Sequence, residues 1–269
     1  MLQVKAFEIP KSLVWKSYLE VRKNRGAAGC DGQTIKQFDE NRNRNLYKIW
    51  NRLSSGSYFP PPVREKKIPK GDGKERTLGI PTVSDRIAQG AVKLFMEEQL
   101  DPIFHPDSYG YRPEKSAHQA LKQCAQRCWQ YNWVLEIDIS AFFDNVRHDL
   151  IIKALEHHKM PKWVMLYCKR WLEAPMQKEG QEGELMNRDI GTPQGGVISP
   201  LLANLFLHYA FDKWMDRYYK DRPFERYADD IVCHCRTMKE ACHMKEVLQW
   251  RLQCKRLADP HRQTLLVMI

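Results

Sequence analysis

The segment that decides the fold reads Phe224-Glu225-Arg226-Tyr227-Ala228-Asp229-Asp230-Ile231-Val232-Cys233. Two adjacent acids stand there between two strand-like runs, which predicts a tight hairpin with the acids at its tip. A second acid-bearing strand comes earlier, in Trp133-Val134-Leu135-Glu136-Ile137-Asp138-Ile139. Apolar residues alternate along it, so that Glu136 and Asp138 share one face. We expect the strand end at Asp138 and the hairpin to hold carboxylates on rigid backbone.

Carboxylates in this arrangement suit the joining of two nucleotides, which uses two divalent cations about 4 Å apart. Mg²⁺ takes hard oxygen ligands, and Mn²⁺ can replace it. Asp138, Asp229 and Asp230 are therefore the candidate catalytic and metal-binding residues, and the backbone carbonyl of Ile139 is a further candidate ligand. Tyr227 would support a primer end by packing. Taken alone, the four residues Tyr227-Ala228-Asp229-Asp230 are also compatible with an ordinary turn, and Asp138 is compatible with an acid on the surface.

The composition favours a polyanionic partner. Among 269 residues, 43 Lys and Arg face 33 Asp and Glu, which leaves a net charge of +10. Residues 41–76 alone hold ten basic and three acidic residues. Phosphate neutralisation by such a segment favours nucleic acid binding, although a solvated basic surface has the same composition. No apolar run approaches the roughly 18 residues of a membrane span. The N-terminus is not a signal peptide, and the eight cysteines show no disulfide framework, so we expect a cytoplasmic protein with reduced thiols.

Helices and strands are mixed without βαβ regularity, which predicts an α+β fold. We expect helices over 11–23, 34–53, 81–100, 115–131, 149–158, 199–219 and 238–257, and a basic hairpin over 64–80 that turns at 70–74. Cys233-His234-Cys235 with Cys242-His243 is compatible with zinc. Strand alternation instead favours a buried pair of cysteines with His234 on the opposite face.

Six ordered blocks resemble those of group II intron reverse transcriptases. They are Ile68-Pro69-Lys70 through Arg76-Thr77-Leu78-Gly79-Ile80-Pro81, Tyr109-Gly110-Tyr111-Arg112-Pro113, Ile137-Asp138-Ile139-Ser140-Ala141-Phe142-Phe143-Asp144, Gly191-Thr192-Pro193-Gln194-Gly195-Gly196-Val197-Ile198-Ser199-Pro200, Tyr227-Ala228-Asp229-Asp230, and the N-terminal block Arg25-Gly26-Ala27-Ala28-Gly29-Cys30-Asp31-Gly32. The resemblance covers about residues 20–257. It implies a right-hand polymerase fold, in which a palm with an antiparallel sheet packed on helices carries a fingers subdomain.

The resemblance also assigns roles residue by residue. Lys70 and Arg76 stand where the family grips the incoming triphosphate, and Gln194 where it contacts the nucleotide. Phe143 stands where the family places an aromatic ring that excludes a 2′-hydroxyl. A core role suits Phe142 better, because we expect that two neighbouring side chains cannot both point inward. Gly195 and Gly196 would let the backbone approach the template and primer. The basic residues Arg25, Arg42, Arg44 and Lys48 are candidate RNA contacts.

The implied organisation is an N-terminal extension and fingers over 1–95, palm over 96–146, a connection over 147–195 and palm again over 196–269. The family's thumb is expected to be absent, through trimming or a truncated gene, because residues 258–269 match the next block only loosely. The expected partners are an RNA template, intron RNA, a DNA primer and deoxynucleoside triphosphates. A homo-oligomer is compatible with the sequence, which does not specify one.

Three alternatives remain. A retron-like reverse transcriptase is disfavoured by the block from Arg25 to Gly32. An RNA-binding splicing cofactor (maturase) with an idle polymerase site is disfavoured by the complete set of acids, although both roles coexist in the family. An RNA-dependent RNA polymerase would need a polar residue near Phe143 to accept the 2′-hydroxyl.

Overall fold

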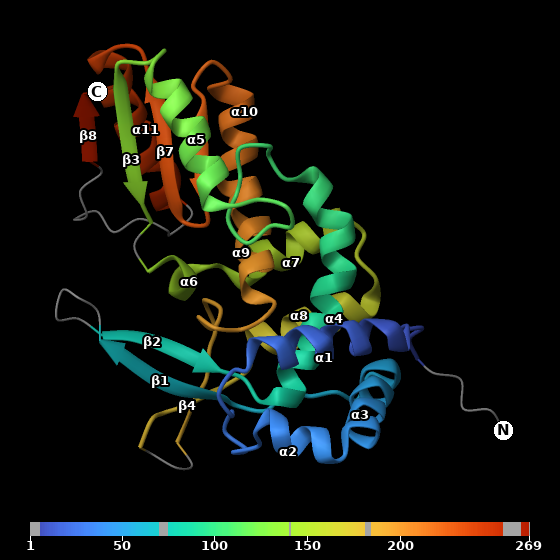
Figure 1. The fold of residues 1–269 in the computed structure, drawn as a ribbon. Coiled ribbons are helices and arrows are strands. Elements are labelled where there is room, and N and C mark those ends of the chain that lie inside the picture. The colour runs from blue at the N-terminus through green and yellow to red at the C-terminus, as the bar shows by residue number, and fades with distance from the viewer. Residues whose placement is uncertain (1–5, 70–74, 140, 181–183, 255–264, 269) are drawn as a thin grey trace. The chain divides into compact units, whose positions relative to one another are not determined.

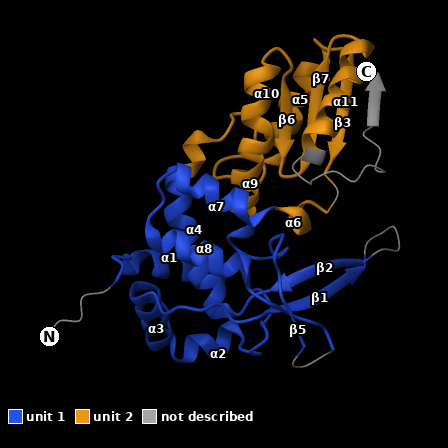
Figure 2. Cartoon of the chain, turned by 180° about the vertical axis from the view of Figure 1, so that it is seen from behind, with its two compact units in different colours: residues 1–99, 147–199 blue, residues 100–146, 200–269 orange. Residues whose placement is uncertain are grey.

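The computed structural model describes residues 6–69, 75–139, 141–180, 184–254 and 265–268, with the backbone alone for residues 253, 254 and 265–268. The chain divides into two compact units (Figure 2). Unit 1 comprises residues 1–99 and 147–199, and unit 2 comprises residues 100–146 and 200–269. Each unit combines helices with one four-stranded sheet (Figure 1), so the α+β prediction is confirmed.

Unit 1 places helices against a sheet of order β2-β1-β4-β5. Its strands are β1 (Val63–Pro69), β2 (Glu75–Ile80), β4 (Met176–Gln177) and β5 (Leu185–Met186), and its helices are α1 (Lys11–Asn24), α2 (Ile35–Glu40), α3 (Arg42–Ser55), α4 (Val83–Leu100), α7 (His148–His157) and α8 (Lys162–Leu172). β1 and β2 form the expected basic hairpin, in which Ile68 lies opposite Arg76. Its turn at 70–74 lies outside the described residues.

The core of unit 1 forms around α4, whose residues Ile87, Ala88 and Val92 have no exposed surface. A close helix approach is possible because Gly90 has no side chain: a Cβ there would lie 2.2 Å from Oγ of Ser17. That hydroxyl donates instead to the carbonyl of Ile87 at 2.8 Å. Burial of these apolar surfaces is the main source of stability in the unit.

The buried carboxylate of Asp85, also on α4, accepts hydrogen bonds from three side chains. Tyr58 donates at 2.8 Å, Trp171 at 2.9 Å and Gln89 at 2.9 Å. Burial raises the pKa of Asp85, because water is excluded from the charged form. The three donors satisfy the oxygens that burial removes from water.

Unit 2 contains an antiparallel sheet of order β6-β7-β3-β8. Its elements are a 3₁₀ turn (Asp101–Ile103), α5 (Ala117–Cys128), β3 (Trp133–Asp138), α6 (Phe142–Asn145), α9 (Ser199–Leu207), a π-helical turn (His208–Asp212), α10 (Lys213–Tyr218), β6 (Phe224–Tyr227), β7 (Asp230–Cys235), α11 (Met238–Cys254) and β8 (Leu265–Met268). Helix α5 contacts β6 and β7, and α11 contacts β3 and β7.

The alternation predicted for β3 is confirmed. Leu135 and Ile137 are buried, while Glu136 and Asp138 are exposed on the other face. In β7, Cys233 and Cys235 are buried in the same way, because a strand sends alternate side chains to one face. The face opposite the acids therefore belongs to the core. On the acids' own face Val134 and His234 are buried as well, so that this face is open at Glu136 and Asp138.

Two long helices predicted from the sequence are interrupted. The helix expected over 34–53 divides at Asn41, whose φ of −123° is not helical, into α2 and α3. The helix expected over 199–219 changes pitch in the π-helical turn before α10. None of the helices in the described part of the chain is long and apolar enough to cross a membrane.

Candidate active site

Three acids of unit 2 lie at the end of β3 and in the hairpin of β6 and β7. Asp138 lies opposite Asp230 in the antiparallel register of β3 and β7. Tyr227 and Asp230 close the β6–β7 hairpin as register partners, so that Ala228 and Asp229 form a two-residue turn. The predicted hairpin is therefore confirmed, and the register brings the backbone of Asp138 beside the acids of the turn.

A further acid stands beside these residues. Glu136 occupies the same face of β3 as Asp138, two positions earlier, and both are exposed. Burial, followed by the charges of Asp138 and Glu136, raises the pKa of Asp230. Neighbouring carboxylates disfavour one another's ionisation unless a cation offsets their charge. The hard oxygen donors at this edge of the sheet match the preference of Mg²⁺.

The turn itself carries an unusual backbone conformation. Ala228 has a φ of 57°, in the left-handed region that residues with a side chain seldom adopt. The second residue of the turn, Asp229, does not have a positive φ. A positive φ at the first central position alone matches a type II′ turn, in which glycine is preferred at that position. An alanine in this conformation costs roughly 1–2 kcal/mol, so the surroundings must hold it.

Arg226 supplies that support from the adjoining strand. Its side chain is fully buried, and its guanidinium donates to both carboxylate oxygens of Asp212, at 2.8 and 2.7 Å. The third nitrogen donates to the carbonyl of Ala228 at 3.1 Å and to Oδ1 of Asn204 at 3.0 Å. The planar guanidinium thereby joins the strained turn to the helical segment that carries Asn204 and Asp212.

Gly110, in the segment between the 3₁₀ turn and α5, contacts the same turn. A Cβ at this position would lie 2.3 Å from the backbone nitrogen of Ala228, so that only glycine fits. The carbonyl of Gly110 accepts a hydrogen bond from Nδ2 of Asn204 at 2.7 Å. Beside it, the backbone nitrogen of Tyr109 donates to the carbonyl of Arg226 at 2.8 Å. The turn is thus enclosed by glycine, amide and guanidinium contacts.

These supporting residues were not identified from the sequence. Arg226 was seen as a strand residue, and Asp212 as part of an apolar helix. The available signal was weak: Asp212 is the first acid of the apolar run that begins at Leu201, and Arg226 is the single base of its strand. Fully buried charges occur almost only in pairs, which links the two.

Aromatic residues lie near the acids. Tyr227 is 37% exposed, and its ring centroid lies 6.3 Å from that of Tyr111. Phe143, at the start of α6, is 9% exposed, and Phe142 is 2% exposed. The expectation that only one of these neighbours could point inward was wrong. They lie in a helical turn rather than a strand, and their rings meet edge to face at 5.5 Å.

Unit 1 brings together two of the residues expected to bind the nucleotide. Nε of Arg76, on β2, donates to Oε1 of Gln194 at 2.8 Å. The backbone nitrogen of Gly79 donates to the carbonyl of Gln194 at 2.7 Å. Gly195 has a φ of 112°, and a Cβ there would lie 2.6 Å from the carbonyl oxygen of Gly79. The loop therefore lies directly on β2 because Gly195 lacks a side chain.

The remaining candidates are placed as follows. Gly196 is buried in the same loop, and its nitrogen donates to the carbonyl of Pro193 at 3.1 Å. Ile139 is buried directly after β3. Lys70 lies outside the described residues. Arg25, at the C-terminal end of α1, and Arg44 and Lys48, on α3, are exposed, while Arg42 is half-buried and lies 5.5 Å from the ring of Trp15.

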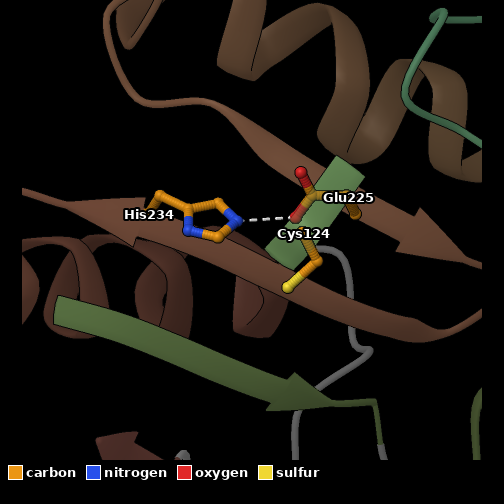
Figure 3. A group of neighbouring side chains, drawn as sticks. All are labelled: Cys124, Glu225 and His234. Carbon is orange, nitrogen blue, oxygen red and sulfur yellow. Dashed lines mark hydrogen bonds and ion pairs between the residues drawn. The ribbon is translucent and has the colours of Figure 1, made fainter. Parts of the chain in front are cut away.

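One cluster in unit 2 has the residue types of a metal site. Ligand atoms of Cys124, Glu225 and His234 lie within 4.8 Å of one another (Figure 3). His234 and Arg127 each contact one oxygen of Glu225, at 2.6 and 2.5 Å. Burial, followed by the charge of Glu225, raises the pKa of Cys124 to about 12, so the thiol stays protonated. The cluster is accounted for as a buried ion-pair network that fixes α5 against β6 and β7.

The model of the family described as reverse transcriptase (RNA-dependent DNA polymerase) matches residues 68–258. The chain belongs to the reverse transcriptase family. Residues 68–258 of this reverse transcriptase domain include Asp138, Asp229 and Asp230, as well as Arg76 and Gln194. The resemblance seen in the sequence blocks is thereby confirmed at the level of the family.

Curated relatives of this reverse transcriptase include proteins of group II introns. The chain is 35% identical over 199 residues to the group II intron-encoded protein LtrA of Lactococcus lactis subsp. cremoris, which covers 73% of this chain and 32% of that protein. It is 36% identical over 198 residues to protein YkfC of Escherichia coli K12, covering 71% of this chain and 50% of that protein. The chain thus spans a third to a half of these relatives' length.

A solved structure supports the polymerase fold. An apo telomerase from Candida tropicalis, truncated from its C-terminal domain, matches 82% of this chain with a TM-score of 0.59 at 13% identity. At this identity the match supports the fold alone. The right-hand polymerase fold expected from the sequence is confirmed.

Proposed function

We propose that the chain is the fingers and palm portion of an RNA-directed DNA polymerase encoded by a group II intron. The observation that carries this proposal is the register pairing of Asp138 with Asp230, next to Asp229 in a strained and supported turn. Its partners are an RNA template, intron RNA, a DNA primer and deoxynucleoside triphosphates. Unit 1 corresponds to the fingers and unit 2 to the palm, and the protein acts in the cytoplasm.

The residues at the end of β3 and in the turn fit divalent cations. Asp138, Asp229 and Asp230 would hold two Mg²⁺ ions, with the carbonyl of Ile139 as a further ligand and Mn²⁺ as a substitute. Burial, and after it the charges of Asp138 and Glu136, raises the pKa of Asp230, and a bound cation would offset the repulsion among these carboxylates. When bound, the cations supply activation of the primer hydroxyl and neutralisation of the leaving phosphates.

Candidate residues of each unit would position the substrates. Tyr227 supports the primer end by packing, and the Phe143 ring stands under the incoming sugar and excludes a 2′-hydroxyl. Arg76 and Gln194 bind the nucleotide: their hydrogen bond orients the guanidinium, which neutralises charge on the triphosphate. Lys70 shares that role. Gly195 and Gly196 allow the backbone to approach the template and primer.

A second role, RNA binding in splicing, is favoured by the basic face of α3. Arg44 and Lys48 lie four residues apart and are both exposed, and Arg42 precedes them at the helix start. Arg25 adds a further exposed cation at the end of α1. Cations at this spacing share one helix face and can follow a phosphate backbone. This role coexists with polymerisation.

Primer extension on an RNA template tests the polymerase proposal. Asp138→Asn removes a ligand worth several kcal/mol in the transition state, so the rate should fall on the order of a thousand-fold. Glu136→Gln, on the same face of the same strand, is the matched control and should change the rate less than ten-fold. A similar rate in Asp138→Asn and the native chain would refute the proposed metal site.

A further inference from the structure

A groove in unit 2 lies apart from the acids of the turn and combines aromatic rings with cations. It has a volume of about 550 Å³ and lies between the segment 209–219 and helix α11. This volume falls in the usual range of small-ligand pockets. Its rings belong to Tyr209, Trp214, Tyr218, Tyr219 and Trp250.

Two of these aromatic rings, those of Tyr218 and Trp250, are exposed to solvent. Tyr218 and Trp250 are each 61% exposed, although burying a large aromatic side chain is ordinarily favourable. Trp214 is half-buried, with its ring 4.9 Å from that of Tyr219 and 6.2 Å from that of Tyr218. The groove therefore offers open faces of two rings on a packed aromatic base.

Positive charge accompanies the rings. Lys213, Arg217 and Arg251 line the groove, and its lining includes no carboxylate. Within the described part of the chain, neither Lys213 nor Arg217 forms an ion pair. The acid of the same helix, Asp216, is engaged instead by His105 at 3.2 Å. Helix α10 thus directs its cations and rings to the groove.

The groove has a rigid frame. Nε of Arg251, on α11, donates to the carbonyl of Ala210 at 2.9 Å, and its guanidinium lies 5.6 Å from the ring centre of Trp214. The guanidinium of Arg217 lies 5.5 Å from the ring centre of Tyr218. The Arg251 contact ties α11 to the π-helical turn, and each of the two guanidinium groups lies beside an aromatic ring of the groove.

We propose that this groove binds a single-stranded nucleic acid, with Trp250 and Tyr218 stacking on unpaired bases and Lys213 and Arg217 contacting phosphates. Base faces are available for stacking only where a strand is unpaired. Aromatic residues and Arg are also enriched at protein–protein interfaces, but Lys is depleted there, whereas a phosphate backbone favours the added charge of Lys213. The site is separate from the basic face of α3 and from the polymerase acids.

Fluorescence anisotropy with labelled uridine hexamers tests the groove, using the whole chain at several salt concentrations. Trp250→Ala should weaken binding about ten-fold, because one stacking platform is lost. Trp250→Phe should restore most of the affinity. Trp129→Ala removes a side chain of the same kind that is 91% exposed in the same unit, and should change nothing. A deoxyuridine hexamer run in parallel distinguishes RNA from DNA as the ligand.

Charge is tested separately. Neutralising Lys213→Gln and Arg217→Gln together should make the slope of log affinity against log salt shallower by about 1.4 for a single strand. Primer extension by these variants should stay at the native rate, which separates this site from polymerisation. Equal hexamer affinity in Trp250→Ala and Trp129→Ala would overturn the proposal. So would a loss of self-association in Trp250→Ala with hexamer binding intact, since the groove would then join copies of the chain.

Discussion

Arg226 and Asp212 form a two-pronged ion pair at 2.8 and 2.7 Å, and neither side chain has exposed surface. The same guanidinium holds the carbonyl of Ala228 at 3.1 Å. A fully buried pair contributes little net stability over apolar residues of the same size. The ion pair instead holds Arg226 in place, and Arg226 fixes the position of the hairpin turn beside Asp229 and Asp230.

Removing the acid of this pair should be costly. Asp212→Ala leaves the buried guanidinium without its counter-charge, and we expect a loss of about 3–5 kcal/mol in the free energy of unfolding. Asp216→Ala, four residues along the same helical segment and partly exposed, is the control and should lose less than about 1 kcal/mol. Urea denaturation followed by circular dichroism measures both. Equal losses would contradict a supporting role for Asp212.

Gly110→Ala should disturb the turn without removing any polar group. The new methyl group would meet the backbone of Ala228 at 2.3 Å, so the turn must shift. We expect the rate of primer extension to fall at least about ten-fold, because small misplacements of reacting groups cost that much or more. Gly180→Ala adds a methyl group where no atom lies within 4 Å, but the φ of 77° at this position strains an alanine by about 1 kcal/mol. It therefore controls for a loss of stability away from the turn, and it should leave the rate unchanged. A native rate in Gly110→Ala would show that the position of the turn is not critical.

Nucleotide selection should depend on Phe143. If Phe143 fills the space under the sugar as proposed, Phe143→Ala opens that space. We then expect the ratio of ribonucleotide to deoxynucleotide incorporation to rise at least about ten-fold, since a pocket that selects by exclusion loses its discrimination. Phe142→Ala is the control: its ring packs 6.2 Å from that of Phe206, so it should cost about 3–5 kcal/mol of stability without changing selection. Single-nucleotide incorporation assays give the ratio. Unchanged discrimination in Phe143→Ala would assign that ring to the core alone.

RNA affinity should depend on the basic face of α3. Reversing Arg42, Arg44 and Lys48 to Glu together should weaken binding of structured RNA and flatten its salt dependence, because fewer counterions are released. Mg²⁺ binding at Asp138 and Asp229 serves as the control and should be unaffected. Filter binding at several salt concentrations decides the matter. Salt-independent RNA binding in the native chain would mean that the basic segment is only a solvated surface.

Local patterns in the sequence were sufficient for the strand that ends at Asp138 and for the hairpin around Asp229, since alternation and turn chemistry act over a few residues. The resemblance located Arg76 and Gln194. Their hydrogen bond joins positions more than a hundred residues apart, and no local pattern specifies it. The contact forms because Gly195 lets its loop lie on β2, which depends on tertiary packing.

Other features escaped prediction for a different reason. The break at Asn41 had a local signal, because Asn is a weak helix former that is favoured at helix starts. The apolar periodicity across residues 34–53 outweighed that signal in the prediction. Arg226 was not recognised because a base in a strand is usually solvated, and its burial depends on Asp212 in a separate helical segment. Phe142 and Phe143 were treated as strand neighbours, whereas a single helical turn allows both to be buried.

The π-helical turn His208–Asp212 has a consequence for how this part of the chain can vary. A turn that holds one extra residue rotates everything after it by about 100° around the helix axis. Deleting one residue there would restore a regular α-helix and leave composition and length almost unchanged. It would also rotate Trp214 and Tyr218 away from α11, and would change the direction of Asp212 relative to Arg226. Asp212 is constrained in type by its ion pair with Arg226. At the other positions of this segment residue number is under tighter constraint than residue type, so that conservative substitutions should be tolerated where single deletions are not.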